Sequence, residues 1–156
     1  CQSAIIVLYE KGRGNLKIAN LNRCFGCGKD NPIGLRLEIT YVNDKTHIEF
    51  IVGPEYCGYP GIMHGGAIAT LMDEVMFHTI ARLGIQAVTA SMTIDFKNPA
   101  LEGRHLAAEA WVKNRDGKGK KIEVEAIITD SGTGKVIAEG RGKFVEIDFK
   151  KLIEDK

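Results

Sequence analysis

The chain has 156 residues, 44% of them hydrophobic and 26% charged, with a formal net charge of +1 at pH 7. These values are ordinary for one globular domain with its own core, and the near-neutral charge gives no electrostatic case for binding nucleic acid or an anionic membrane. No apolar run approaches the ~20 residues that a membrane helix needs, so we expect a cytoplasmic protein with no membrane partner and no nucleic-acid partner.

The sequence divides into a leader over residues 1–23 and one domain over residues 24–156. An apolar run at 5–9 within the leader suits either an added strand or a short helix. A lipidated mature protein would also begin with a cysteine, as this chain does at Cys1, but the residues that follow do not resemble an exported tether. Four cysteines in all do not indicate a disulfide-rich secreted scaffold.

The first part of the domain predicts a β-hairpin followed by a loop. After a turn-rich segment at 24–34, residues 35–41 and 47–52 alternate between apolar and polar side chains, a period of two that is typical of half-buried strands. Polar and charged residues at 43–45 mark the turn between them. Several glycine and proline residues then indicate a loop over 53–63.

One long helix follows this loop. Apolar side chains recur at spacings of three and four over 66–83, and Gly84 is placed to end the helix. Four further strands are predicted, over 87–96, 105–114, 121–130 and 136–147. One helix with about six mostly antiparallel strands defines an α+β domain. Because the helix is apolar on most of its circumference, we expect a curved sheet to wrap around it, with edge strands that pair between two subunits.

The turn His64-Gly65-Gly66 leads directly into the predicted helix. Backbone N–H groups at a helix start have no acceptor within the helix and bind anions, so Gly65 and Gly66 are candidates to hold a thioester oxygen as it becomes an oxyanion. Asp73 lies further along the same helix among apolar neighbours, where a carboxylate is a candidate base or nucleophile. Together these groups can polarise a carbonyl and attack it.

The spacing between Gly65 and Asp73 predicts a dimer. Eight residues correspond to ~12 Å of helix rise, whereas both groups must lie ~3 Å from one reacting carbon or its water. A single helix does not meet both conditions, so the acid must come from a second copy of the chain. Glu74 points ~100° away from Asp73 around the helix, and we expect it either at the substrate or as a surface charge that can pair with His78.

These features resemble the hotdog-fold acyl-CoA thioesterases of the phenylacetate-degradation (PaaI-like) type. The resemblance covers about residues 24–148 and rests on Gly61-x-x-His64-Gly65-Gly66 with Asp73 nine positions after the histidine, on the strand 88–96 followed by Pro99, and on the hairpin 134–142. It implies an antiparallel sheet of five or six strands around one long central helix. It also implies homodimers whose sheets join edge to edge and that often pair into tetramers.

The same resemblance implies roles for four residues. The Gly65 amide would polarise the thioester carbonyl, and Asp73 of the facing subunit would activate water or attack directly. His64 would shape the loop or orient the carbonyl, and Thr89 occupies a position where some relatives hold the water with a hydroxyl. One departure is Gly58, because some relatives carry an asparagine there, near the attacking water.

Substrate contacts are expected from the turn region and from two arginines. Arg141, between two glycines, and Arg115, within a basic cluster over 113–121, are candidates for the phosphates of coenzyme A. A solvated turn is the simpler interpretation of any single lysine in that cluster. The other substrate-binding candidates are Gly66, Tyr59, Met63 and Glu74. We expect no cofactor, since coenzyme A is part of the substrate.

Cys24 and Cys27 have the spacing of half a zinc site. A structural zinc would need two more ligands, and Cys57 with His64 or Cys1 are the only thiol-rich options. One such pair of cysteines is weak support for a metal. We therefore favour a packing turn here and expect no metal.

The sequence favours hydrolysis of acyl-CoA thioesters to the free acid and CoA. Two alternatives remain: a non-catalytic acyl-CoA sensor on the same fold, and a hotdog hydratase or dehydratase. Against the sensor, residues 1–23 are too short and too poor in basic residues for a DNA-binding segment. Against the hydratase, the long helix lacks a His–Asp pair suited to a β-hydroxyl substrate.

Overall fold

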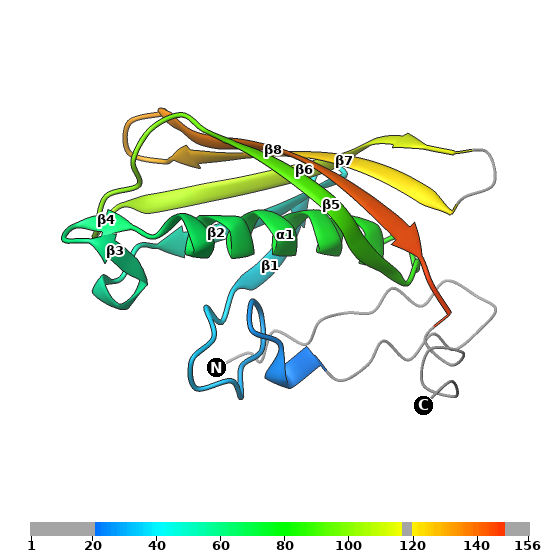
Figure 1. Cartoon of the computed structure of the whole chain (residues 1–156), viewed down its shortest axis with the longest axis horizontal. Coiled ribbons are helices and arrows are strands. Elements are labelled where there is room, and N and C mark those ends of the chain that lie inside the picture. The colour runs from blue at the N-terminus through cyan, green and yellow to red at the C-terminus, as the bar shows by residue number, and fades with distance from the viewer. Residues whose placement is uncertain (1–20, 117–119, 149–156) are drawn as a thin grey trace.

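A computed structural model describes residues 21–116 and 120–148 of the chain, and the expected leader strand or helix at 5–9 lies outside these residues. One helix, α1 (Gly65–Ala81), lies against a six-stranded antiparallel sheet that arches over it (Figure 1). The sheet strands are β1 (Glu38–Val42), β2 (Lys45–Ile51), β5 (Ala87–Phe96), β6 (His105–Arg115), β7 (Lys121–Asp130) and β8 (Val136–Glu146). This is the predicted α+β arrangement.

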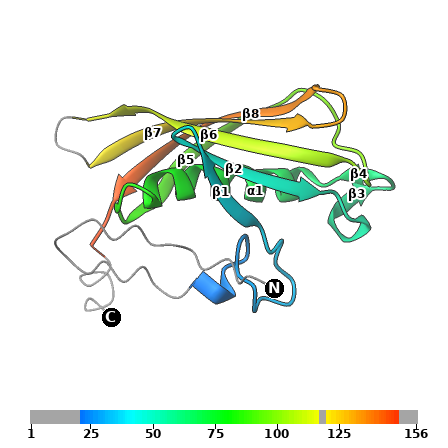
Figure 2. The ribbon, with the colours of Figure 1, turned by 180° about the vertical axis from the view of Figure 1, so that it is seen from behind.

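The strand order across the sheet is β1-β2-β6-β7-β8-β5, so β1 and β5 are its two edges. Figure 2 shows the sheet from behind, with β1 and β2 crossing on the near side. The first two strands form the predicted hairpin, with Val42 opposite Lys45. The other four agree with the predicted ranges within one residue at each end. Regular alternation over ten or more residues explains this agreement.

The loop before the helix has more structure than predicted. A 3₁₀ turn, η2 (Pro54–Tyr56), precedes two very short strands, β3 (Cys57–Tyr59) and β4 (Ile62–Met63), which pair with each other. A further 3₁₀ turn, η1, spans Leu21–Arg23. Strands of two or three residues are too short for any periodic pattern to show in the sequence.

The core lies between the inner face of the sheet and α1. Helix residues including Leu71, Met72 and Met76 are completely buried, against sheet residues such as Phe144. Strand β8 approaches the helix closely because it carries Gly140, where a Cβ atom would lie only 2.6 Å from Met72 Sδ. The burial of most helix positions confirms the expectation that the sheet wraps the helix. This 17-residue helix is the only α-helix in the described residues, and none there is long and apolar enough to cross a membrane.

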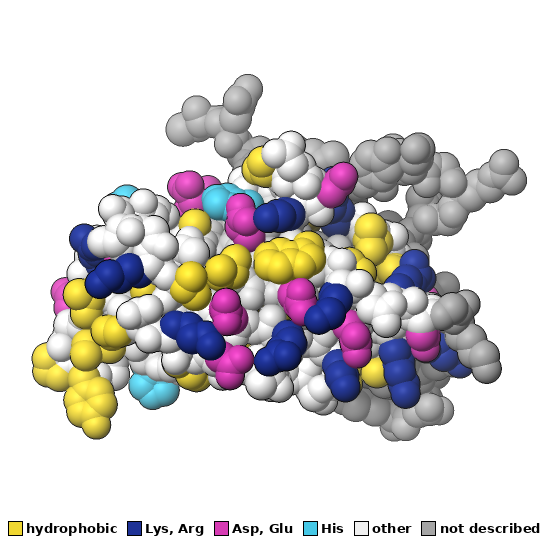
Figure 3. Space-filling view, turned by 90° about the horizontal axis from the view of Figure 1, so that it is seen from above, with side chains coloured by type: hydrophobic (Ala, Val, Ile, Leu, Met, Phe, Trp, Pro, Cys, Tyr) yellow, Lys and Arg dark blue, Asp and Glu magenta, His cyan; other side chains and the backbone are white. Residues whose placement is uncertain are grey.

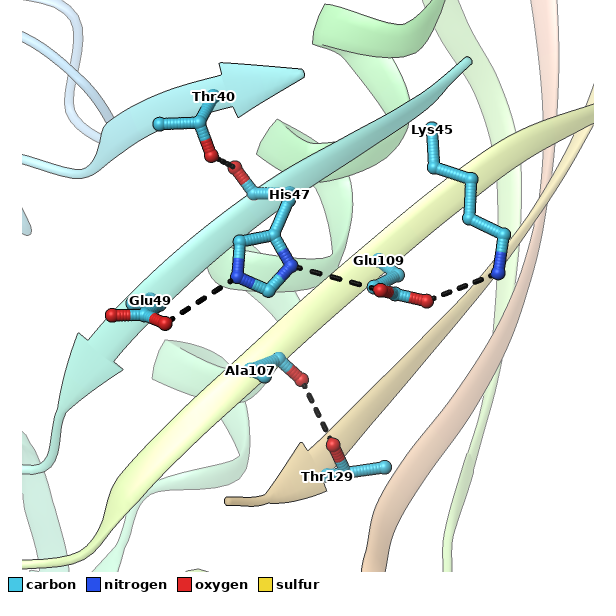
Figure 4. A network of polar contacts seen from close by, with 7 residues as sticks. All are labelled: Thr40, Lys45, His47, Glu49, Ala107, Glu109 and Thr129. Atoms are coloured by element: carbon cyan, nitrogen blue, oxygen red, sulfur yellow. Dashed lines mark hydrogen bonds and ion pairs between the residues drawn. The ribbon is translucent and has the colours of Figure 1, made fainter. Parts of the chain in front are cut away.

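The outer face of the sheet is polar. Figure 3 looks onto this face, where basic and acidic side chains alternate around a short row of hydrophobic ones. His47 lies between two carboxylates, 3.6 Å from Glu49 and 3.7 Å from Glu109, and Lys45 reaches the other oxygen of Glu109 at 3.1 Å (Figure 4). The two faces of the sheet therefore differ, and only the inner face contributes to the core.

Candidate active site

The start of α1 is fixed by His64. Its backbone is extended (φ −64°, ψ 137°), and its Nδ1 accepts a hydrogen bond of 2.8 Å from the Gly66 N–H. The His64 N–H in turn donates to the Tyr56 carbonyl at 2.7 Å, which ties the turn to η2. Histidine thus serves as the N-cap, a position where short polar side chains are usual.

The two glycines of the turn are not equivalent. The Gly66 N–H is occupied by His64, whereas the Gly65 N–H has no acceptor within residues 21–116 and 120–148. Gly65 is the first residue of the helix, so its N–H also lies at the positive end of the helix dipole. One free donor, from Gly65, therefore faces the site, in place of the two expected from the sequence.

An open pocket of about 390 Å³ adjoins this donor. This volume falls within the range of small-molecule sites. It brings together four of the predicted site residues, Tyr59, Met63, His64 and Gly65. Its full lining is Gly58, Tyr59, Ile62, Met63, His64 and Gly65.

Gly58, the departure from the family pattern, makes room for the His64 ring. A Cβ atom at position 58 would lie 2.9 Å from His64 Cδ2, closer than real side chains approach. An asparagine at this position would therefore require the ring to move. Glycine at position 58 therefore leaves the space that the helix-capping imidazole of His64 occupies.

Asp73 lies halfway along α1 and contacts the edge strand β5. Its Oδ1 accepts a hydrogen bond of 2.7 Å from the Thr89 hydroxyl. Burial raises the pKa of Asp73, the Thr89 hydrogen bond opposes this change, and the nearby Glu74 charge adds to it. The structure thus joins two predicted site residues, in surroundings where a carboxylate is poorly solvated.

Asp73 does not line the pocket beside Gly65 of its own chain. The two residues lie eight positions apart on one continuous helix, with ~12 Å of rise between them. The opposite ends of β5 flank these two positions: Thr89 contacts Asp73, while the Phe96 ring lies 3.6 Å from where a Cβ on Gly65 would be. Strand β5 therefore runs past both halves of the proposed site.

Glu74 is buried, so the expectation that it is a surface charge is wrong. It is only 9% exposed, and its carboxylate contacts the Cys24 thiol at 3.1 Å and His78 Nε2 at 3.3 Å. Glu74 does not line the pocket beside Gly65 of its own chain, so the substrate contact expected of it stays a prediction. The expected pairing with His78, one helical turn later, is present.

The two predicted arginines lie on the sheet rather than at the pocket. Arg141 on β8 pairs with Asp95 at 3.5 Å, and Arg115 at the end of β6 lies 4.0 Å from Glu146. Both are about half exposed or more, so their guanidinium groups are accessible to solvent. Within one chain, neither meets the turn at Gly65.

The sequence analysis did not predict two residues that lie beside the Gly65 turn, Ile62 and Phe96. Ile62 lines the pocket, and 55% of Phe96 is exposed although it is a large aromatic residue. The sequence does not indicate that a phenylalanine at the end of an alternating strand is exposed. The contact depends on where β5 meets the start of α1, which only the tertiary structure defines.

A helix wrapped by an antiparallel sheet, with a capped and partly free helix start beside an open pocket, defines a hotdog-type domain. Comparison with known proteins agrees. Residues 60–135 match the family model of the thioesterase superfamily. Human acyl-coenzyme A thioesterase 13 is 33% identical over 102 residues, which cover 62% of this chain and 69% of that protein.

Solved structures show the same fold. The E. coli PaaI protein of the phenylacetic acid degradation operon superposes with a TM-score of 0.68 and 26% identity, over 78% of this chain and 84% of that one. A hypothetical thioesterase of Streptococcus pneumoniae, solved with coenzyme A, has a TM-score of 0.66 at 19% identity over 71% and 85%. The chain belongs to the thioesterase superfamily, and the predicted hotdog fold is confirmed.

Proposed function

We propose that this protein hydrolyses acyl-CoA thioesters to the free acid and CoA. The observation that carries the proposal is the free Gly65 N–H at the start of α1, beside an open pocket. A backbone donor at this position suits the oxyanion that forms when a thioester carbonyl is attacked. The relatives named acyl-coenzyme A thioesterases support the substrate class.

Asp73 of a second protomer supplies the attack in this proposal. Its carboxylate either takes a proton from a water that attacks the carbonyl carbon, or adds to that carbon itself and forms an anhydride with the acyl group that water then hydrolyses. In both routes the C–S bond breaks, and CoA leaves with a proton taken from the water. Partial burial keeps the carboxylate poorly solvated, and therefore reactive, while Thr89 holds it in place. The reaction needs no cofactor besides the CoA of the substrate.

The geometry of β5 supports a site shared between two protomers. This strand is an edge of the sheet and pairs only with β8 among the described residues, so its outer edge is open to pairing. An antiparallel pair of β5 strands centred between Thr89 and Phe96 would set these two residues opposite each other. Thr89 contacts Asp73, and Phe96 lies beside Gly65. This pairing would therefore bring Asp73 of each copy toward the helix start of the other copy.

Arg141 and Arg115 are proposed to contact the phosphate end of CoA from the sheet. Both guanidinium groups are accessible, and neither is held in a buried ion pair. Tyr59 and Met63 are proposed to contact the acyl end, because they line the pocket beside Gly65. We further propose a cytoplasmic homodimer, with dimers pairing into tetramers.

The test is thiol release from short, medium, long and aryl acyl-CoA substrates by the wild type and by Asp73→Asn. We expect Asp73→Asn to lose about 10²-fold or more in turnover, the usual effect of removing a general base, with CoA affinity retained. Asp44→Asn is the matched control, because Asp44 lies in a distant hairpin with its side chain 99% exposed. Full activity in Asp73→Asn would overturn the role of this acid.

The two alternative functions give different results in the same experiment. A sensor would bind acyl-CoA by calorimetry without releasing thiol from any substrate in the panel. A hydratase would change the acyl chain while the thioester stays intact. Either result with the wild type would overturn the proposed hydrolysis.

A further inference from the structure

A compact group of metal-binding side chains lies beside α1, away from the pocket at Gly65. The turn that carries Cys24 and Cys27 rests on the middle of the helix, where it meets Glu74 and His78. The ligand atoms of Cys24, Cys27 and Glu74 all lie within 4.8 Å of one another. His78 Nε2 adds a fourth ligand atom, 3.5 Å from Cys27 Sγ and 3.3 Å from Glu74 Oε2.

Two of these separations match those between neighbouring ligands of a tetrahedral zinc ion. With Zn–S bonds of about 2.3 Å and Zn–N and Zn–O bonds of about 2.0–2.2 Å, neighbouring ligand atoms lie about 3.3–3.8 Å apart. The distances from His78 Nε2 to Cys27 Sγ and to Glu74 Oε2 fall in this range, and Cys24 Sγ lies 3.1 Å from the other carboxylate oxygen of Glu74, Oε1. Two thiolates, one imidazole and one carboxylate form a donor set typical of zinc.

One buried carboxylate oxygen of the cluster accepts no hydrogen bond from the described residues. Glu74 is only 9% exposed, and its Oε2 accepts no hydrogen bond in the part of the chain that the structure describes. A buried carboxylate oxygen without a donor is costly. This oxygen lies 3.3 Å from His78 Nε2, where a cation shared with the neighbouring side chains would satisfy it.

The backbone of the turn is shaped to bring the cysteines onto the helix. A Cβ atom at Gly26 would lie 2.1 Å from Glu74 Cγ, so a larger residue would push the turn away. The Leu37 N–H donates to the Gly26 carbonyl at 3.0 Å, and the Leu35 N–H donates to the Phe25 carbonyl at the same distance. The two thiols are therefore positioned by hydrogen bonds that do not involve the thiols themselves.

We propose that Cys24, Cys27, Glu74 and His78 bind one Zn²⁺ ion as a structural site. On binding, two thiol protons leave to solvent and two Zn–S bonds form, while His78 binds through Nε2 and Glu74 through a carboxylate oxygen. The ion takes no part in the reaction. It fastens the turn before β1 to the helix residue adjacent to Asp73.

The first test is the zinc content of the full chain, purified without chelators or a histidine tag. We expect about one zinc per protomer, the content of a single filled structural site. Cys24→Ser, Cys27→Ser and His78→Asn should each lose most of this zinc. Cys57→Ser is the matched control, because this thiol contacts Gly53 and Glu102 rather than Glu74 or His78 and its loss should leave the zinc content unchanged.

The second test uses the wild type and so does not depend on whether a variant folds. After chelation, we expect Tm to fall by about 5 °C or more and to recover when zinc is returned. Addition of Co²⁺ should produce thiolate charge-transfer and d–d absorption bands that zinc displaces. Protein with neither zinc nor cobalt bands, or with Cys24 and Cys27 joined as a disulfide as isolated, would overturn the proposal.

Discussion

Thr89 on the edge strand β5 donates a hydrogen bond of 2.7 Å to Asp73 on α1. The contact links an open sheet edge to the acid proposed for catalysis. In a site shared by two protomers, the strand that pairs with the second copy is then also the strand that positions the attacking group. Assembly and the orientation of the carboxylate are coupled through one side chain.

Thr89→Val removes this hydrogen bond while it keeps the shape of the side chain. We expect kcat for acyl-CoA hydrolysis to fall about tenfold, in line with the loss of one charge-assisted hydrogen bond of about 1.5–3 kcal/mol that water partly replaces. Thr89→Ser retains the hydroxyl and should recover most of the activity. If valine and serine reduce kcat equally, the hydroxyl does not position Asp73.

Gly65→Pro tests the backbone donor itself. Proline has no N–H, it is favoured at the first position of a helix, and the extended backbone of His64 suits a residue before proline. The helix should therefore form normally, while turnover falls by about 10²–10³-fold, the usual effect of losing one oxyanion donor.

Gly65→Ala is the control for this substitution. It keeps the N–H, and its Cβ would lie 3.6 Å from the Phe96 ring, an ordinary contact. We expect Gly65→Ala to retain most of its turnover. Equal losses in the alanine and proline variants would mean that space beside Phe96, and not the donor, limits the reaction.

Asp130 provides a prediction for stability against pH. Its carboxylate accepts from Arg104 Nε at 2.8 Å and from the N–H groups of Gly132 and Thr133. The Arg104 hydrogen bond, with help from these amides and against the effect of burial, lowers the pKa of Asp130. Ionised Asp130 therefore stabilises the folded state at neutral pH, and this contribution is lost as pH falls through its unfolded and folded pKa values.

Asp130→Asn should thus be less stable than the wild type at pH 7, and the difference should shrink as the pH falls below about 4. Urea unfolding at pH 7 and at pH 3 measures this directly. Asp44→Asn, at a carboxylate that is 99% exposed, should show little difference at either pH. A deficit in Asp130→Asn that is the same at both pH values would contradict the ionic contribution.

Long periodic elements were predictable from the sequence, and short or distant contacts were not. The helix and the last four strands follow from regular spacing of apolar residues. Strands β3 and β4 are too short for such a pattern. The burial of Glu74 depends on thiols 50 residues away in the chain, so the sequence offered no reason to separate it from an ordinary surface carboxylate.

Some features of the candidate site were likewise predictable from the sequence, and others were not. Its residue types and their spacing on one helix predicted Gly65 and Asp73 as partners in different copies. The occupation of the Gly66 N–H by His64 depends on the orientation of the ring, which a sequence does not specify. Phe96 lies beside Gly65 because β5 passes the start of α1, a consequence of tertiary packing.

The most direct measurement is the activity of a mixed dimer, in which one protomer carries Gly65→Pro and the other Asp73→Asn. Each parent variant alone should retain about a hundredth of wild-type turnover or less. Isolated with two different affinity tags, the mixed dimer holds one site with both groups intact, so it should show about half of wild-type turnover per dimer. A mixed dimer no more active than its parents would contradict a site built from two protomers.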